Sequence, residues 1–161
     1  MMPRPVAVLL AIAAMCPSGV AQAQTREPTV QELTAVRYCF AKYEDKLELE
    51  TNCLFKLVAE PCMETEGGYS THGMADCHRI ETKIWDRILN ETFRELLADL
   101  KDKEREKKLR EMQRAWIVSR DRTCEFYDRE IHGSQAIPMG AACMARETAR
   151  RAILLKSFGS L

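Results

Sequence analysis

Four polar side chains stand at helical spacing within otherwise apolar stripes. Asp86 and Asn90 are four residues apart in one segment, and Gln113 and Arg120 are seven apart in another. If both segments are helices, each pair lies on one face of its helix. The set could bind a polar ligand, but it includes no nucleophile and no second acid or base for catalysis. We therefore interpret it as a buried polar network that fixes helix packing, because such groups are costly to bury unpaired.

The cysteines and histidines suggest metal or haem binding as a second kind of chemistry. Met74-Ala-Asp-Cys77-His78 resembles a haem-attachment motif, but Met74 stands where the first cysteine is required. The histidines (His72, His78 and His132) have no zinc-ligand spacing to the cysteines or to one another. The sequence also lacks nucleophile-elbow, zinc-protease and phosphate-loop motifs. It therefore predicts no cofactor and no metal, and it gives no support for an enzyme.

Residues 1–23 have the three parts of a secretory signal peptide. Arg4 supplies a positive charge, Val6–Met15 is an apolar run, and Ala21-Gln22-Ala23 is a small-x-small cleavage site. The run is too short to span a bilayer in the mature chain. Cys16 suggests a lipoprotein signal, but the residue before it is not small. We expect a cleaved signal, a single domain over residues 24–161, and a periplasmic or secreted location.

Cleavage would also leave an even number of cysteines. They are Cys39, Cys53, Cys62, Cys77, Cys124 and Cys143. In an exported chain this count predicts three disulfides, and their pairing cannot be deduced from the count. The 24 basic and 24 acidic residues of the whole chain balance, and the charge run over residues 101–108 mixes both signs. Nothing here predicts binding to nucleic acid.

Apolar residues recur every three or four positions along much of the chain, and no segment alternates as a strand does. Helices are expected over Thr29–Leu47, about Thr51–Ala59, Ala75–Leu100, Leu109–Cys124 and Ala141–Phe158. Residues 61–74 are expected to form a glycine-rich loop, and residues 100–106 a turn. The predicted fold is all-α, a small disulfide-stapled helical bundle built on a long antiparallel helical hairpin.

The expected turn sets the register of that hairpin. It places Asp86 opposite Arg120 as a charge-assisted pair, and Asn90 opposite Gln113 as a hydrogen-bonded pair. The network would then join the two long helices directly. We expect loss of Arg120 to destabilise the fold by about 3 kcal/mol, because Asp86 would remain without a partner.

The same register leaves two pairings open for Cys124. Cys77 lies level with it across the hairpin, whereas Cys143 closes a shorter loop. A disulfide over a loop of that size is worth about 3 kcal/mol in the chain-entropy account.

Several motifs resemble one family of small exported bacterial helical proteins, the LprI-like family. They are Trp85-Asp86-x-x-Leu89-Asn90, Leu109-Arg110-x-x-Gln113-Arg114-Ala115-Trp116-Ile117-x-x-Arg120-Asp121-x-x-Cys124, Gly133-Ser134, Cys143 and Thr148-x-x-Arg151. The resemblance covers about residues 50–156. The family is named after a lysozyme-inhibitor lipoprotein, so the resemblance implies a non-enzymatic binding protein that inhibits lysozyme or a related cell-wall hydrolase. The alternative is a structural or stress-related envelope protein that binds another periplasmic partner.

An inhibitor of a basic hydrolase benefits from an acidic approach surface and a protruding loop. The candidate acidic residues are Glu44, Asp45, Glu48 and Glu50. Tyr69 and His72 occupy the first candidate loop, which Cys62 and Cys77 flank, and Ser134 occupies the second. We favour the first loop for binding a partner, because a pinned loop with a rigid aromatic side chain loses little entropy on binding. The competing interpretation is a loop that only covers the end of the hairpin core.

Overall fold

The computed structural model describes residues 25–159, apart from the side chain of Asp128, and the expected signal peptide lies outside this range. The helices in it are α1 (Val30–Lys42), α2 (Lys46–Cys53), α3 (Ala59–Met63), α4 (Thr71–Asp99), α5 (Lys103–Glu130) and α6 (Ala136–Phe158). No strand occurs between residues 25 and 159, and no helix there is both long and apolar enough to cross a membrane. The predicted all-α, disulfide-stapled bundle is confirmed.

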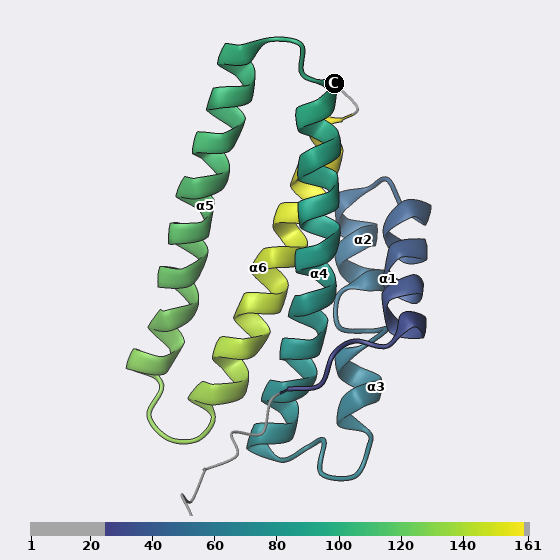
Figure 1. Cartoon of the computed structure of the whole chain (residues 1–161). Helices are drawn as coiled ribbons and strands as arrows, with labels where there is room; N and C mark the ends of the chain where they lie inside the picture. The colour runs from purple at the N-terminus through teal and green to yellow at the C-terminus, as the bar shows by residue number, and fades with distance from the viewer. Residues whose placement is uncertain (1–24, 160–161) are drawn as a thin grey trace, which may run out of the picture.

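The three long helices lie side by side, with α6 between α4 and α5 (Figure 1). α4 and α5 form the expected antiparallel hairpin around a short turn at residues 100–102, but α6 is the main partner of both. α1, α2 and α3 lie on the side of α4 away from α5 (Figure 1). The expectation that the two hairpin helices pack directly on each other is therefore wrong. The last helix was expected to pack in the bundle, but its position between α4 and α5 was not predicted.

The core lies mainly between α4, α6 and the two N-terminal helices. Its largest fully buried side chains include Trp85, Ile84 and Leu89 on α4, with Leu49 on α2 and Leu155 on α6. The face of α6 that meets α4 carries alanines, which let two helix backbones approach closely. They are Ala141, Ala145, Ala149 and Ala152, all buried. In contrast, α5 buries few side chains, among them Leu109, Gln113 and Cys124.

The helix expected over Thr29–Leu47 is interrupted. Its start is correct, because Thr29 and Glu32 form the reciprocal cap of α1. The break comes at Asp45, whose side chain accepts a hydrogen bond from the Glu48 N–H at 2.9 Å and so begins α2. The helix expected over residues 51–59 is replaced by the end of α2, a turn at residues 54–58 and α3.

Three helices begin earlier than expected. α5 begins at Lys103 rather than Leu109, because the Asp102 carboxylate caps it by accepting from the Glu104 N–H at 2.8 Å. α4 begins at Thr71, because the Ser70 hydroxyl caps it by accepting from the Gly73 N–H at 3.0 Å. α6 begins at Ala136, so Pro138 and Gly140 lie inside it. Proline is tolerated in the first turn of a helix, where its missing N–H would have no partner in the helix.

Each disulfide joins two helices that are consecutive in the chain. The pairs are Cys39–Cys53, Cys62–Cys77 and Cys124–Cys143. The cross-hairpin alternative for Cys124 is thus not formed, because α6 brings Cys143 alongside it. The three disulfides link α1 to α2, α3 to α4, and α5 to α6.

Candidate functional site

The expected polar network does not form between α4 and α5. Asp86 and Asn90 are exposed on α4 and bind each other, with Asn90 Nδ2 donating to Asp86 Oδ2 at 3.1 Å. Arg120 donates instead to Oδ1 of its neighbour Asp121, from Nε at 2.9 Å and from Nη2 at 2.8 Å. The predicted Asp86–Arg120 pair is wrong, because α6 occupies the space between the two helices.

A different polar contact joins α5 to α6. Arg151 of α6 donates from Nε to the side-chain oxygen of Gln113 at 2.9 Å. Arg151 is only 7% exposed, and its Nη2 has no hydrogen-bond partner among the described residues. Trp116 packs against two guanidinium groups, with Arg120 at 4.9 Å and Arg151 at 5.6 Å from the ring centroid. Burial lowers the pKa of Arg151. These contacts join α5 to α6 through Gln113, Trp116 and Arg151.

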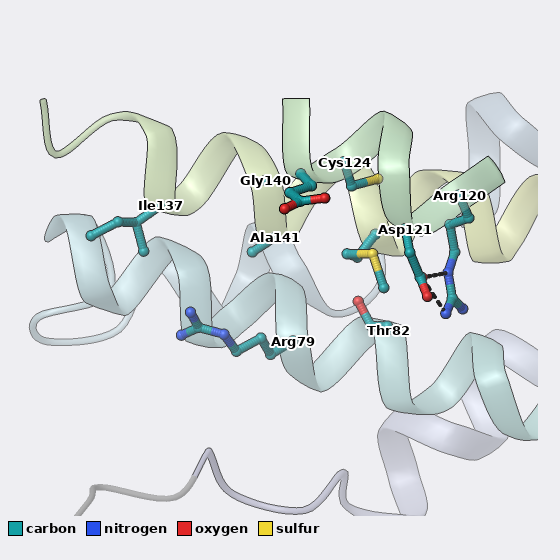
Figure 2. Close-up of a pocket in the computed structure, with 10 residues that line it drawn as sticks. Arg79, Thr82, Arg120, Asp121, Cys124, Ile137, Gly140 and Ala141 are labelled. Carbon is teal, nitrogen blue, oxygen red and sulfur yellow. Dashed lines mark hydrogen bonds and ion pairs between the residues drawn. The ribbon is translucent and has the colours of Figure 1, made fainter. Parts of the chain in front are cut away.

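A groove of about 770 Å³ runs between α4 and α5, with α6 as its floor (Figure 2). Its charged rim comprises Arg79 from α4 and Arg120, Asp121 and Glu125 from α5. Each of these groups is paired with a residue of its own helix, for example Arg79 with Asp76 at 2.9 Å. The groove contains no nucleophile with an adjacent base. Between residues 25 and 159, no group of three His, Cys, Asp or Glu side chains could hold a metal.

The buried titratable groups serve the fold. The Glu81 carboxylate is fully buried and accepts from Phe55 N–H at 2.7 Å, Ala59 N–H at 3.0 Å and Trp85 Nε1 at 3.0 Å. Burial raises the pKa of Glu81, against these three donors. His78 lies edge-on to Phe55, and burial lowers its pKa to about 4. Both side chains contact the turn before α3, Glu81 through hydrogen bonds and His78 through the Phe55 ring.

The loop between α3 and α4 presents Tyr69 to solvent on a rigid support. Tyr69 is 68% exposed, and His72 is exposed in the first turn of α4. Two turns close the loop, with the Gly68 N–H donating to Thr65 O at 2.9 Å and the Ser70 N–H to Gly67 O at 3.1 Å. The disulfide between Cys62 and Cys77 ties its ends together. The loop expected over residues 61–74 is therefore shorter than predicted, because α3 runs to Met63 and α4 begins at Thr71.

Glycine is required at two points of this loop and at one in the first turn of α4. Gly67 has φ +76°, which L side chains rarely adopt. A Cβ on Gly68 would overlap the carbonyl oxygens of Met63 and Cys62, and a Cβ on Gly73 would overlap that of Gly67. The loop is thus packed against its own backbone, which fixes the position of Tyr69.

The other predicted binding residues lie in two places. Ser134 is exposed in the α5–α6 connection, at the same end of the bundle as the loop before α4 (Figure 1). The acidic residues within 44–50 lie in the connection from α1 to α2 and in the first turns of α2, at the end of these two helices that is far from the loop (Figure 1). Two of them are paired with α6, Glu44 with Lys156 at 3.3 Å and Glu50 with Arg150 at 3.0 Å. This acidic cluster is therefore partly neutralised and separate from the loop.

Two acidic residues on the loop itself were missed in the sequence. Glu64 and Glu66 are exposed, close to Tyr69 in the chain, and neither has an ion-pair partner among the described residues. The sequence signal that could have identified them is their position three and five residues before Tyr69, in the segment Glu64-Thr-Glu66-Gly-Gly-Tyr69.

Comparison with known proteins identifies the family. The family model for lysozyme inhibitor LprI matches residues 62–155, more than half of the chain. The chain belongs to the lysozyme inhibitor LprI family. No curated protein and no solved structure matches it. The LprI region begins at Cys62 rather than near residue 50, so it contains the loop, α4, α5 and most of α6 but neither α1 nor α2. The LprI family is one of inhibitors rather than enzymes.

Proposed function

We propose that this protein is exported and inhibits lysozyme or a related cell-wall hydrolase by inserting the loop of residues 64–72 into its cleft. The observation that carries the proposal is the LprI family match, which includes this loop and its disulfide. Three disulfides suit an oxidising compartment outside the cytoplasm, in agreement with the signal-like sequence of residues 1–23.

The geometry of the loop supports its role as the inserted element. An exposed tyrosine on a support that is already ordered gives contact area without a large entropic cost on binding. The two catalytic groups of a lysozyme are carboxyls in a cleft, and the Tyr69 hydroxyl and the His72 ring can both donate hydrogen bonds to carboxylates.

Charge favours the same loop. Lysozymes of the animal type are basic, so an acidic surface on the inhibitor accelerates encounter. Glu64 and Glu66 place two unpaired negative charges on the loop. The residues 44–50, which were expected to supply this surface, contribute less because α6 neutralises two of them.

The test measures lysozyme-driven clearing of a bacterial cell suspension with increasing amounts of the oxidised protein. We expect inhibition by the parent and its loss in Tyr69→Ala/His72→Ala. Tyr38→Ala is the matched control, because Tyr38 is 71% exposed on α1, outside the LprI region. Circular dichroism checks that each variant is folded. A folded loop variant that inhibits as well as the parent would exclude the loop, and a parent without inhibition would favour another envelope partner.

A further inference from the structure

One flank of α5 is left uncovered by the rest of the bundle. It carries uncharged residues at three- and four-residue steps, which places them on one face of the helix. We call this face the α5 stripe, and it consists of Met112, Ala115, Trp116, Ser119, Thr123 and Phe126. Met112 is 46% and Phe126 is 60% exposed, and Trp116 is half-buried. An exposed, uncharged face that carries large apolar side chains at both ends is typical of an interaction surface.

The stripe is arranged symmetrically about Ser119. Met112 and Phe126 each lie two helical turns from it, in opposite directions, and Lys108 and Glu130 lie beyond them at the two ends. Both charged residues are exposed, and neither has an ion-pair partner among residues 25–159. One end of the stripe is therefore positive and the other negative.

This arrangement selects a second copy of the chain running antiparallel. With Ser119 opposite Ser119, Met112 of each copy meets Phe126 of the other, and Lys108 meets Glu130. A parallel copy would instead place Lys108 against Lys108 and Glu130 against Glu130, which is unfavourable.

The Met112 end of the stripe borders a hollow that suits the second copy. The hollow has a volume of about 530 Å³ and lies between the α4–α5 turn and the end of α6, with Leu100, Leu109, Met112 and Phe158 among its lining residues. In the antiparallel register, Phe126 of the second copy arrives beside Met112 and can enter this hollow, which Asp99, Arg105 and Lys108 also line.

We propose that two copies of this protein form a two-fold symmetric dimer through their α5 stripes, packed antiparallel about Ser119. Two-fold dimers are the commonest protein oligomers, and their interfaces are self-complementary in this way. One helix from each copy gives a small interface, so the dimer dissociates at low concentration. α3 and its following loop lie across α4 from α5 (Figure 1), so dimerisation leaves the proposed inhibitory loop free and stands apart from it.

The first test measures mass by light scattering or sedimentation of the oxidised protein over a range of concentrations. We expect the parent to reach the dimer mass below about 1 mM. Ser119→Arg places two like charges at the centre and should yield a monomer. Ser119 is exposed, so circular dichroism should remain unchanged. Thr34→Arg, an exposed change on α1, should leave the dimer intact.

The second test exchanges the charges at the ends of the stripe. Lys108→Glu should raise the dissociation constant of the dimer about tenfold, because the new carboxylate repels Glu130 at both ends of the symmetric interface. Lys108→Glu/Glu130→Lys should restore the parent value. A parent that stays monomeric, a dimer that survives Ser119→Arg, or an exchange that restores nothing would each overturn the proposal.

Discussion

Removing the Cys62–Cys77 disulfide tests whether the loop acts as a pre-ordered element. The bond closes a loop with a sequence separation of 15, so its loss frees about 3 kcal/mol of chain entropy in the unfolded state. Cys62→Ala/Cys77→Ala should lower the free energy of unfolding in urea by about that amount. The loop must also be re-ordered on binding, which costs about 2 kcal/mol or more. That corresponds to a rise of about 30-fold in the inhibition constant for lysozyme.

The chain provides a matched control for this experiment. Cys39 and Cys53 have a sequence separation of 14, so Cys39→Ala/Cys53→Ala should cost the same, about 3 kcal/mol of stability. That disulfide lies outside the LprI region, and its loss should leave the inhibition constant unchanged below the unfolding transition. Equal loss of inhibition in both variants would refute the reasoning, because stability alone would then explain the effect. So would full inhibition by the Cys62→Ala/Cys77→Ala protein.

Three further predictions concern other parts of the molecule. Gln113→Leu should lower the free energy of unfolding by about 1–3 kcal/mol, because Arg151 loses its acceptor, and Gln113→Leu/Arg151→Met should cost less; additive losses in urea would contradict the contact. Lowering the pH from 7 to 5 should destabilise the parent more than His78→Phe. The pKa of His78 is about 4 in the folded protein, whereas a free histidine has a pKa near 6.5. As the pH falls through 6.5, the unfolded chain therefore binds a proton that the folded protein does not, and the free energy of unfolding falls by at most about 3 kcal/mol. An equal loss of stability in the parent and in His78→Phe would show that a group other than His78 causes the pH dependence. Glu64→Gln/Glu66→Gln should slow association with lysozyme at low salt and reduce its salt dependence, as stopped-flow fluorescence would measure; an unchanged rate would exclude steering by these carboxylates.

The fold could be predicted from the sequence where local signals were strong. The capping pair at Thr29 and Glu32 predicted the start of α1 correctly, and the apolar stripe of α4 predicted most of that helix. The errors arose where a cap was not recognised, as at Asp45 and Ser70, and at the start of the last helix, which was expected at Ala141 although Pro138 fits the first turn of α6. The place of α6 between α4 and α5 depends on the fit of its alanine face, which no local pattern reveals.

The polar network shows why side-chain partners were harder to predict. Burial of Gln113 on α5 was expected and is observed, but the partner comes from α6. A register calculated for two helices could not include a third, so Arg120 was assigned to Asp86. The signal for Arg151 was present in the sequence, since it is a charged residue on the buried, alanine-rich face of α6. The candidate loop was found from Tyr69 and its flanking cysteines, and the structure adds how tightly its glycines pack.

The most direct measurement of the proposed function is calorimetric titration of lysozyme with the oxidised protein, repeated with a chito-oligosaccharide filling the lysozyme cleft. We predict that each chain binds one lysozyme molecule and that the oligosaccharide weakens this binding. Tyr69→Ala/His72→Ala should abolish the binding, and Tyr38→Ala should preserve it. Binding that is indifferent to the filled cleft and to the loop variant, or no binding by the parent, would contradict insertion of this loop into the cleft.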